Sequence, residues 1–348
     1  MKSHLLTNAR KNKNDEFYTQ YRDIEDEMRG YIKHNPKAFK GKTILLPCDD
    51  PEWSNFTKYF AQNFDKLGLK KLISTSYAPN TRQTIKENAQ LALFGTDSPK
   101  YDKSRHASHG RIFTLERDRT GDGRTNYEDI EWNYLKGDGD FRSDEVKALR
   151  DEADIIITNP PFSLFREFLS WINDKKFIIV GNMNAITYKE VFPLIQSDKL
   201  WLGVRPNPDM YFEIPDGFTY ADTYKFKREI DGVGVCRVPT IAWFTNLEHG
   251  KRHEPLALMS KSDNMKHSKH QVIRESGYQK YDNYEAIDVP FTDAIPSDHK
   301  GVMGVPISFL PKYCPEQFEI LGLSNPRGII GGETQYARIF IKQRKAIK

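Results

Sequence analysis

Residues 154–162 read Asp-Ile-Ile-Ile-Thr-Asn-Pro-Pro-Phe, and this stretch decides the fold. The apolar run Ile155–Ile157 is typical of a buried strand, and the Asn-Pro-Pro after it ends the strand in a rigid polar corner. Around this stretch, short apolar runs alternate with segments of helical periodicity. This alternation predicts an α/β fold, a mostly parallel Rossmann-like sheet with helices on both faces. Such sheets bind ligands beyond the carboxyl ends of their strands, where strand order reverses, so a ligand is expected at the corner.

The same periodicities place the other elements. We expect strands over residues 43–48, 72–77, 177–181, 200–204, 240–245 and 305–310 and near Ile339, and helices over residues 53–63, 81–93, 145–150, 164–171, 188–196 and 315–321. Polar, turn-rich excursions at 95–131 and 205–238 interrupt the alternation, and residues 111–115 with the Gly-rich turn after them suggest a hairpin. From about residue 249 the pattern changes to basic loops.

Length and composition set the domain organisation. The chain has 348 residues, of which 38% are apolar and 29% charged, a composition of ordered globular protein. This length exceeds the usual single domain, so we expect a large core with a second unit. We assign a basic N-terminal arm to residues 1–14, the core to residues 15–248, and a smaller C-terminal region to residues 249–348.

The residues also exclude several classes of protein. The longest apolar runs fall far short of the roughly 20 residues that a membrane span needs, and the N-terminus lacks the apolar stretch of a secretory signal. We therefore expect a cytoplasmic protein without membrane association. The three cysteines are widely spaced and odd in number, which fits neither a disulfide framework nor a zinc site. The four histidines within residues 249–270 match no helical zinc motif, so no metal is expected.

Basic residues are concentrated in three segments. The net charge is only +4, but residues 249–280 hold seven Lys and Arg against three Asp and Glu, and residues 1–14 and 338–348 contain basic residues and no acidic ones. Basic segments on a near-neutral body are typical of nucleic-acid binding, although solvated tails explain the charge alone equally well. The candidates for phosphate contacts are Lys251, Arg252, Lys266 and Lys269.

The corner Asn159-Pro160-Pro161-Phe162 suits one kind of chemistry. An exocyclic amine on a nucleobase is a poor nucleophile because its lone pair is delocalised into the ring, so an enzyme must stabilise the pyramidal nitrogen of the transition state. The Asn159 side-chain oxygen and the Pro160 carbonyl can accept from the two N–H bonds, and Phe162 offers a face for stacking. The alternative is a Pro-Pro turn that only ends a strand, but its position at the carboxyl end of a buried strand favours catalysis.

Three further segments are candidates for ligand binding. The run Cys48-Asp49-Asp50 closes the first strand, where acidic side chains can accept from an amino group, although a helix N-terminus is an equally good interpretation. In Gly137–Phe141, Asp140 can accept from an amine and Phe141 can pack on a ring, or the segment is a plain turn. Residues 15–20 read by themselves only as the start of an amphipathic helix.

Together these segments resemble the motif set of amino-methyltransferases, and specifically the EcoRI-type adenine-N6 DNA methyltransferases. The resemblance runs over most of the chain and thins over residues 95–131 and 205–275. It implies a class I methyltransferase sheet of seven strands, one of them antiparallel, and S-adenosylmethionine as the cofactor. By the same resemblance the catalytic residues are Asn159, Pro160, Pro161 and Phe162, and the cofactor-binding residues are Tyr18, Thr19, Cys48, Asp49, Asp50, Asp140, Phe141 and Asn159.

The activity that the resemblance implies is site-specific methylation of adenine N6 in double-stranded DNA, on a base flipped out of the duplex. Residues 249–348 then form the target-recognition region. We expect a monomer that acts separately from any cognate restriction endonuclease. Two alternatives stay open, because Asn-Pro-Pro-Phe also occurs in methyltransferases of RNA guanine N2 and of protein glutamine, and because a catalytically inactive DNA-binding protein can share the fold.

Overall fold

The structure, a computed structural model, describes residues 18–51, 54–78, 100–106, 108–205, 210–213, 227–230, 233–237 and 240–344. These residues form two compact units. The first consists of the described residues up to Met183 and those from Met210 to Glu248, and the second of residues 184–205 and 249–344. The helix expected over residues 81–93 and the basic arm 1–14 lie outside the described residues.

The first unit contributes seven neighbouring strands to a mixed sheet, in the order β5-β4-β3-β2-β6-β7-β12. The strands are β2 (Thr43–Leu46), β3 (Lys71–Thr75), β4 (Arg111–Leu115), β5 (Glu131–Tyr134), β6 (Ile155–Thr158), β7 (Lys176–Asn182) and β12 (Ile241–Thr245). Strands β3, β2, β6 and β7 are parallel to one another. In contrast, β4 is antiparallel to β3, and β12 is antiparallel to β7.

This sheet confirms the predicted α/β class, with one difference in strand direction. The hairpin expected near residues 111–115 is β4–β5, which pairs from Arg111↔Tyr134 to Thr114↔Glu131. The hairpin continues the sheet because β4 also pairs with β3. Among these seven strands, β4 and β12 therefore run against the central four, where the resemblance implied one antiparallel strand.

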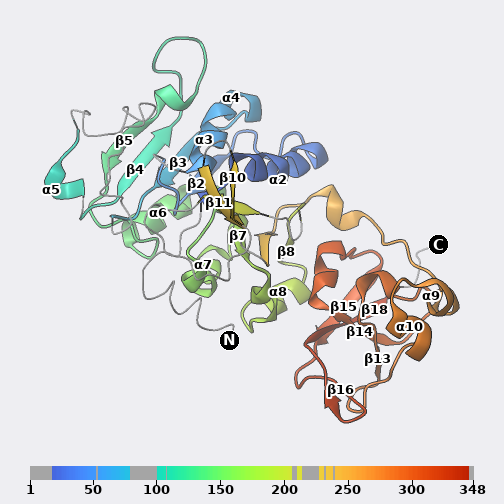
Figure 1. Cartoon of the computed structure of the whole chain (residues 1–348). Helices are drawn as coiled ribbons and strands as arrows, with labels where there is room; N and C mark the ends of the chain where they lie inside the picture. Colours follow the sequence, from blue (N-terminus) through green and yellow to red (C-terminus); the bar gives the residue numbers. More distant parts are fainter. Residues whose placement is uncertain are drawn as a thin grey trace. The chain divides into compact units, whose positions relative to one another are not determined.

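The central strands are buried on both faces, as their sequences require. Every residue of β2 and β6 is buried, and both strands are nearly continuous aliphatic runs. Helices flank the sheet, with α2 (Tyr21–His34), α3 (Asn55–Gln62) and α4 (Phe64–Leu67) on one side and α6 (Asp144–Glu152) and α7 (Phe165–Ile172) on the other (Figure 1). A further short helix is α5 (Lys103–His106). None of the helices in the described residues has the length and apolar character of a membrane-spanning segment.

Strand order reverses between β2 and β6, and α/β sheets bind ligands at such a point. The chain passes from β2 through α3 to β3 on one side of this point, and from β6 through α7 to β7 on the other. The ladder between β2 and β6 pairs Ile44 with Ile155 and Leu45 with Ile156. Beyond these pairs, strands β2 and β6 both end in turns that the sequence predicts as candidate sites.

A small antiparallel sheet in the first unit holds part of the N-terminal motif. Its order is β1-β9-β11-β10, with β1 (Tyr18–Thr19), β9 (Tyr211–Glu213), β10 (Lys227–Ile230) and β11 (Val233–Arg237). Tyr18 pairs with Glu213 and Thr19 with Phe212. The excursion expected at 205–238 therefore supplies strands that pair with the segment before α2.

The second unit is built on a four-stranded sheet in the order β13-β14-β18-β15. The strands are β13 (Ala286–Asp288), β14 (Val302–Pro306), β15 (Phe318–Leu323) and β18 (Arg338–Gln343), and a separate hairpin is formed by β16 (Ile329–Ile330) and β17 (Glu333–Thr334). The remaining elements are α8 (Phe192–Gln196), β8 (Trp201–Leu202), α9 (Lys261–His267) and α10 (Gln271–Ser276). Its core contains buried side chains of several strands, among them Ile287, Val305, Phe318 and Ile341.

Three expectations for the second unit are wrong. The helix expected over residues 315–321 is strand β15, in which buried Phe318 and Ile320 alternate with exposed neighbours. This period of two outweighs the helical interpretation of the same apolar residues. The strand expected over residues 305–310 ends at Pro306, and the 3-10 helix Ile307–Lys312 follows it. Helices α9 and α10 also stand where loops were expected.

Candidate active site

Three of the sequence motifs meet at the carboxyl edge of the main sheet. The turn Cys48–Asp50, in which Cys48 is half-buried, follows β2, and the corner Asn159–Phe162 follows β6. The segment Gly137–Phe141 lies against the end of β3, where Ala78 N donates to the Asp138 carbonyl at 2.8 Å. The structure thus gathers these motifs around the point where strand order reverses, as the sequence predicted for the corner.

Glycine is required where the segment Gly137–Phe141 passes the end of β3. Gly139 has a φ of +85°, and a Cβ at this position would lie 2.1 Å from the Ser76 carbonyl oxygen. Larger residues rarely adopt such a φ, and the carbonyl leaves no room for a side chain. The Gly-Asp-Gly signal in the sequence therefore marks a close approach of two backbone segments at the site.

The corner leaves β6 at the sheet edge and turns at once into a helix. Asn159 is half-buried, Pro160 is buried, and Pro161 and Phe162 are again half-buried. The Pro161 carbonyl accepts from Leu164 N at 2.9 Å, which starts the 3-10 turn leading into α7. Proline fixes φ at two successive positions, so the corner between Asn159 and Phe162 is stiff.

Asp49 links the turn after β2 to β6, to the start of α3 and to β3. The residue is 7% exposed, and its carboxyl oxygens accept from Thr158 Oγ1 at 2.5 Å and from Ser54 Oγ at 2.9 Å. The hydroxyl of Ser74 donates to the Asp49 carbonyl. Burial raises the pKa of Asp49 to about 7, although the hydrogen bonds from Thr158 and Ser54 lower it. Because the protein supplies a donor to each carboxyl oxygen, a contact of Asp49 with a cofactor stays a prediction.

Asp50 is the more exposed member of the acidic pair, and it binds an arginine that the sequence reasoning missed. Arg111 Nη2 donates to Asp50 Oδ2 at 2.9 Å, and the side chains are 2% and 17% exposed. The guanidinium lies 5.3 Å from the ring centroid of Phe113 and 6.0 Å from that of Trp132. The sequence does contain a signal for this ion pair, because Arg111 is the first residue of the apolar strand Arg-Ile-Phe-Thr-Leu. A cation buried in a strand needs an acidic partner.

The environment of Thr19 indicates whether this candidate site suits a bound cofactor. The residue is 3% exposed, and its carbonyl accepts from Asn55 Nδ2 at 2.9 Å, which joins the N-terminal motif to the start of α3. Its buried hydroxyl has no hydrogen-bond partner among the residues that the structure describes. A buried hydroxyl is unfavourable until a partner satisfies it, so Thr19 fits the S-adenosylmethionine site that the resemblance implies. The side chain of Tyr18 lies outside the described residues.

Asp140 and Phe141 both make contacts within the chain. The Arg142 guanidinium donates to the two Asp140 oxygens at 2.8 and 2.5 Å, and this hydrogen bonding lowers the pKa of Asp140. Phe141 is 5% exposed and packs edge-on against Phe168 and Trp171 of α7. The Phe141 ring is thus part of the packing under α7, and a role of either residue in cofactor binding stays a prediction.

Of the candidate phosphate contacts, Arg252 is corrected by the structure. Lys251 is exposed and pairs with Glu254 at 2.5 Å. In contrast, the Arg252 side chain is 4% exposed and binds Asp198, and its guanidinium lies 3.7 Å from the ring centroid of Trp201. Both the charge and the planar face of Arg252 are used inside the second unit, so it does not present a cation to DNA.

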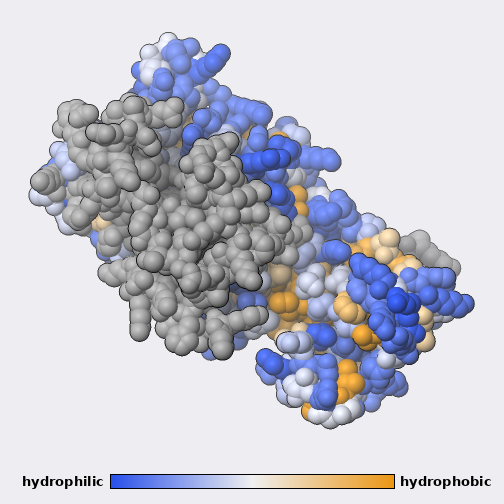
Figure 2. Space-filling model, viewed as in Figure 1, coloured by the Kyte–Doolittle hydropathy of each residue, from blue (hydrophilic) through white to orange (hydrophobic). Residues whose placement is uncertain are grey.

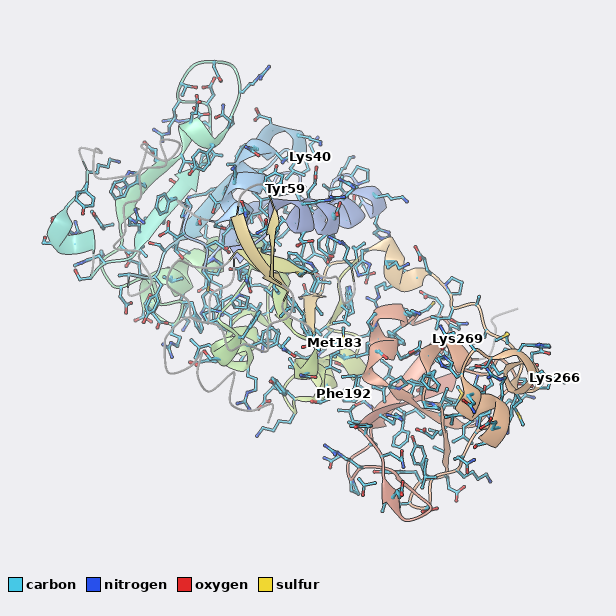
Figure 3. All side chains as sticks on the ribbon, viewed as in Figure 1. Lys40, Tyr59, Met183, Phe192, Lys266 and Lys269 are labelled. Atoms are coloured by element: carbon cyan, nitrogen blue, oxygen red, sulfur yellow. The ribbon has the colours of Figure 1, made fainter. Side chains whose placement is uncertain are left out.

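Lys266 and Lys269 lie on the outside of the second unit, in and just after α9 (Figure 3). Both side chains are exposed, and Lys269 pairs with Asp293 at 2.7 Å. The visible surface around α9 and α10 is mostly hydrophilic (Figure 2). Together with Lys251, these two lysines stay the candidates for phosphate contacts.

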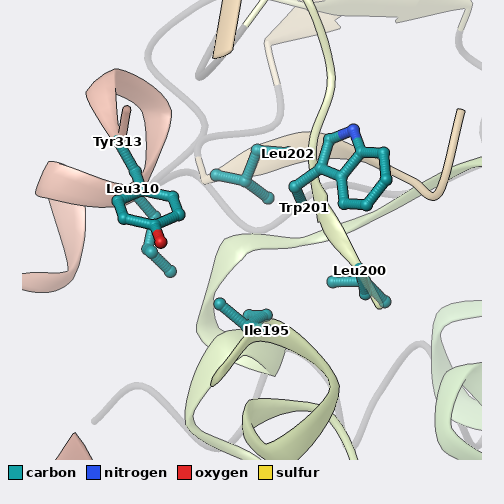
Figure 4. Close-up of a pocket in the computed structure, with 6 residues that line it drawn as sticks. All are labelled: Ile195, Leu200, Trp201, Leu202, Leu310 and Tyr313. Atoms are coloured by element: carbon teal, nitrogen blue, oxygen red, sulfur yellow. The ribbon is translucent and has the colours of Figure 1, made fainter. Parts of the chain in front are cut away.

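A small pocket in the second unit is not a ligand site. It is lined by Ile195, Leu200, Trp201, Leu202, Leu310 and Tyr313 (Figure 4). Its volume of about 10 Å³ accommodates about one water molecule, so it is a gap in the packing and too small for a cofactor. Within the described parts of the chain, no group of three or more His, Cys, Asp or Glu is placed to hold a metal ion.

The sheet has a parallel centre with an antiparallel strand after β7, and it places an Asn-Pro-Pro-Phe corner where strand order reverses. This arrangement defines a class I methyltransferase fold.

Comparison with known proteins gives the family. The family model described as adenine-specific methyltransferase EcoRI matches residues 5–346, and the chain belongs to this family. It is 42% identical to the type II methyltransferase M.EcoRI of Escherichia coli, over 99% of this chain and 98% of the relative. It is 33% identical to M.MpnI of Mycoplasma pneumoniae over 99% of each chain, and 32% identical to M.MgeORF184P of Mycoplasma genitalium over 98% and 99%. No solved structure matches the chain. The protein is therefore an adenine-specific DNA methyltransferase.

Proposed function

We propose that this protein transfers the methyl group of S-adenosylmethionine to the N6 amine of an adenine in double-stranded DNA. The target lies within a specific sequence, and the base is flipped out of the duplex for the reaction. One observation carries the proposal: the corner Asn159–Phe162 lies where strand order reverses, and Thr158 directly before it donates a hydrogen bond to Asp49 of the acidic turn after β2. The adenine specificity of the family supports the choice of base.

The corner acts on the amine through two acceptors. The Asn159 amide oxygen and the Pro160 carbonyl each accept from one N–H bond, which favours the pyramidal nitrogen of the transition state. Asn159 has no useful basicity, so it orients the amine and does not remove a proton before attack. The half-buried ring of Phe162 stacks on the base, a contact worth about 1–3 kcal/mol.

The cofactor is assigned to the edge that holds Thr19, Asp49, Asp50 and Asp140, with Tyr18, Cys48 and Phe141 as further candidates. When bound, S-adenosylmethionine would supply an activated methyl group on its sulfonium, whose sulfur would keep the electron pair of the C–S bond, and the methylated amine would release one proton to solvent. Thr19 donates its buried hydroxyl to this ligand, and the Asp50 carboxylate, fixed by Arg111, accepts from a cationic amino group. The remaining barrier is mainly one of alignment.

The substrate reaches the corner only as an extrahelical base. A stacked and paired adenine hides its amine inside the duplex, and flipping it out costs a few kcal/mol. Phosphate contacts from Lys251, Lys266 and Lys269 position the duplex. We further propose a cytoplasmic monomer of a restriction-modification system that acts separately from any cognate endonuclease.

Methylation of bulk DNA with a donor labelled in its methyl group tests this function. The DNA comes from a host without adenine methylation and is digested to nucleosides after the reaction. The expected product is N6-methyladenine, and single-molecule mapping is expected to place it in one sequence context. Label in cytosine would contradict the proposal. So would label only in RNA or protein offered in parallel, as expected for the alternative guanine or glutamine methyltransferases.

The substitution Asn159→Ala tests the role of the corner. It removes one of the two acceptors, so turnover is expected to fall at least about 100-fold while cofactor binding persists. Methyl transfer is measured under single-turnover conditions, and S-adenosylmethionine binding is measured by calorimetry.

Asn246→Ala is the matched control for this variant. Asn246 accepts from Phe177 N and donates to the Lys175 carbonyl, both at 2.8 Å, at the opposite edge of the sheet. The control variant is expected to lose stability and keep its turnover per folded molecule. Activity of the Asn159 variant within a few-fold of this control would remove Asn159 from the proposed mechanism.

A further inference from the structure

One side-chain hydrogen bond joins the two turns across the point where strand order reverses. Thr158, the last residue of β6, is fully buried, and its Oγ1 donates to Asp49 Oδ2 at 2.5 Å. The backbone ladder between β2 and β6 pairs Leu45 with Ile156 as its last step. The contact between Thr158 and Asp49 thus lies beyond the ladder, where the two parallel strands give way to the turns of the active site.

Asp49 is a rigid anchor for this contact. Its second carboxyl oxygen accepts from Ser54 Oγ at 2.9 Å, and its carbonyl accepts from Ser74 Oγ. The Ser54 side chain also accepts from Phe56 N at 3.1 Å and caps α3. Asp49 is therefore fixed to β3 through its main-chain carbonyl and to the start of α3 through its carboxyl group. The first residue of α3, Asn55, binds the Thr19 carbonyl.

At the other end of the contact, Thr158 directly precedes Asn159 and a stiff Pro-Pro segment. Threonine is branched at Cβ, so few rotamers are open to its hydroxyl and its direction follows the backbone. Downstream of Asn159, the prolines allow little adjustment in φ. A displacement of the Thr158 backbone is therefore passed to the Asn159 side chain and is not absorbed by the corner.

We propose that Thr158 is a positioning residue whose hydrogen bond to Asp49 sets the place of the Asn159 corner relative to the cofactor-binding turn. The inference rests on the proposed function, since it assigns the acceptor to Asn159 and the cofactor to the turn after β2. Thr158 itself touches neither substrate. It acts by aligning the two motifs, and small misplacements of this kind are known to cost enzymes about 100-fold in rate.

The substitutions Thr158→Val and Thr158→Ser test this role. Valine keeps the branched shape and deletes the hydroxyl, so the rate of methyl transfer is expected to fall by about 10- to 100-fold. S-adenosylmethionine binding by calorimetry is expected to change less than about threefold, because the ligand contacts of the turn are retained. Serine keeps the hydroxyl, so Thr158→Ser is expected to restore the rate to within about threefold of wild type.

Thr245→Val controls for the loss of a buried hydroxyl. Thr245 is fully buried at the end of the antiparallel strand β12, and its hydroxyl donates to the Phe177 carbonyl at 2.8 Å, at the amino edge of the same sheet. This variant is expected to melt at a lower temperature and to keep its rate per folded molecule. The comparison separates the placement of Asn159 from a general loss of stability.

Equal rates in Thr158→Val and Thr245→Val would overturn the inference, as would a serine variant as slow as the valine variant. A combined Asp49→Asn and Thr158→Val variant adds a thermodynamic cycle. If the two residues act through one contact, the double variant is no slower than the slower single variant, whereas multiplied defects would contradict the link. A wild-type protein that places no methyl group on adenine refutes the proposed function itself, and this result is independent of any Thr158 variant.

Discussion

Asp49 and Asp50 are adjacent residues of the same type, but their surroundings give them different chemistry. Asp49 receives two hydroxyl donors in a buried position, whereas Asp50 faces the Arg111 guanidinium. A hydroxyl compensates the burial of a carboxylate less than a cation does. The neutral donors leave the pKa of Asp49 near 7. Nothing in the sequence distinguishes the two residues, because the partners come from distant segments.

The raised pKa of Asp49 predicts a pH dependence of stability. The folded protein holds this proton more tightly than the unfolded chain, whose carboxyl has the ordinary value of 3.8. The contribution to stability is therefore complete below about pH 4 and is lost as the pH rises to about 7. For each pH unit in this window, the free energy of unfolding falls by about 1.4 kcal/mol from this group alone, so about 2 kcal/mol is expected between pH 5 and 7.

The measurement compares wild type with Asp49→Asn, which cannot titrate at this position. Denaturant unfolding of both proteins at pH 5, 6 and 7 gives the difference in their free energies of unfolding. This difference is expected to shift against wild type as the pH rises. If the difference in free energy of unfolding were constant with pH, Asp49 would have its ordinary pKa, and its burial would not raise that pKa.

Among single residues, the sequence predicted positions better than partners. The place of the Asn159 corner followed from the strand before it, and the structure brings the turn Cys48–Asp50 to the same edge. The pairing of Asp140 with Arg142 and the burial of Arg252 against Trp201 could not be predicted. The sequence does not distinguish an exposed basic residue from a buried and paired one, because burial depends on which parts of the fold pack against it.

At the scale of elements, periodicity identified those that are buried or long. The strands expected at residues 43–48, 155–157 and 177–181 are present with small changes at their ends, because a run of aliphatic residues has no other favourable place than the sheet centre. Residues 15–20 suggested the start of an amphipathic helix, and helix α2 begins directly after them at Tyr21, with Ile24, Met28 and Tyr31 on one buried face. Short elements such as α9 and β15 carry too few residues for their period to be decisive.

The short 3-10 segment Gly250–His253 illustrates an element that is held by one side chain. Arg252 binds Asp198 and stacks on Trp201, and both partners come from the stretch between α8 and the end of β8. The substitution Arg252→Gln is therefore expected to destabilise the second unit by about 1–3 kcal/mol, through lost stacking and an unpaired partner.

Thermal unfolding checks this prediction, with Lys251→Gln as the neighbouring control. Lys251 is exposed and forms an ion pair with Glu254 in the same turn, so its loss is expected to change stability by less than about 0.5 kcal/mol. Equal melting temperatures for the two variants would show that the burial of Arg252 does not support the second unit.

For the molecule as a whole, the distribution of charge along the chain is more informative than the net charge. A net charge of +4 on 348 residues does not indicate a polyanion as partner. The excess of basic residues in 249–280 falls within the second unit, and all residues of the candidate active site fall within the first. We infer that the reacting groups belong to the first unit and that most phosphate contacts belong to the second. Substitutions that remove charge from the second unit should therefore leave the reacting groups of the first unchanged.

This division predicts how DNA binding responds to salt. Each lysine that contacts a phosphate releases counterions, so removing it lowers the slope of log affinity against log salt by about 0.9. The double substitution Lys266→Gln and Lys269→Gln is therefore expected to reduce the slope by about 1 to 2 and to weaken specific and unrelated duplexes alike. Fluorescence anisotropy between 50 and 200 mM salt measures both quantities.

Two control variants make the test specific to this surface. The pair Lys37→Gln and Lys40→Gln removes the same charge from exposed positions of the first unit, and Arg252→Gln removes a charge that is already paired inside the second. Neither variant is expected to change the slope. Lys37 and Lys40 belong to the first unit, and the Arg252 charge is already paired with Asp198. If the Lys266 and Lys269 variant keeps the wild-type slope, or if the Lys37 and Lys40 pair lowers it as much, the phosphate contacts lie elsewhere on the chain. An effect on S-adenosylmethionine affinity would likewise contradict the separation of the two tasks, since charge lost from the DNA-contacting surface should leave the cofactor-binding edge unchanged.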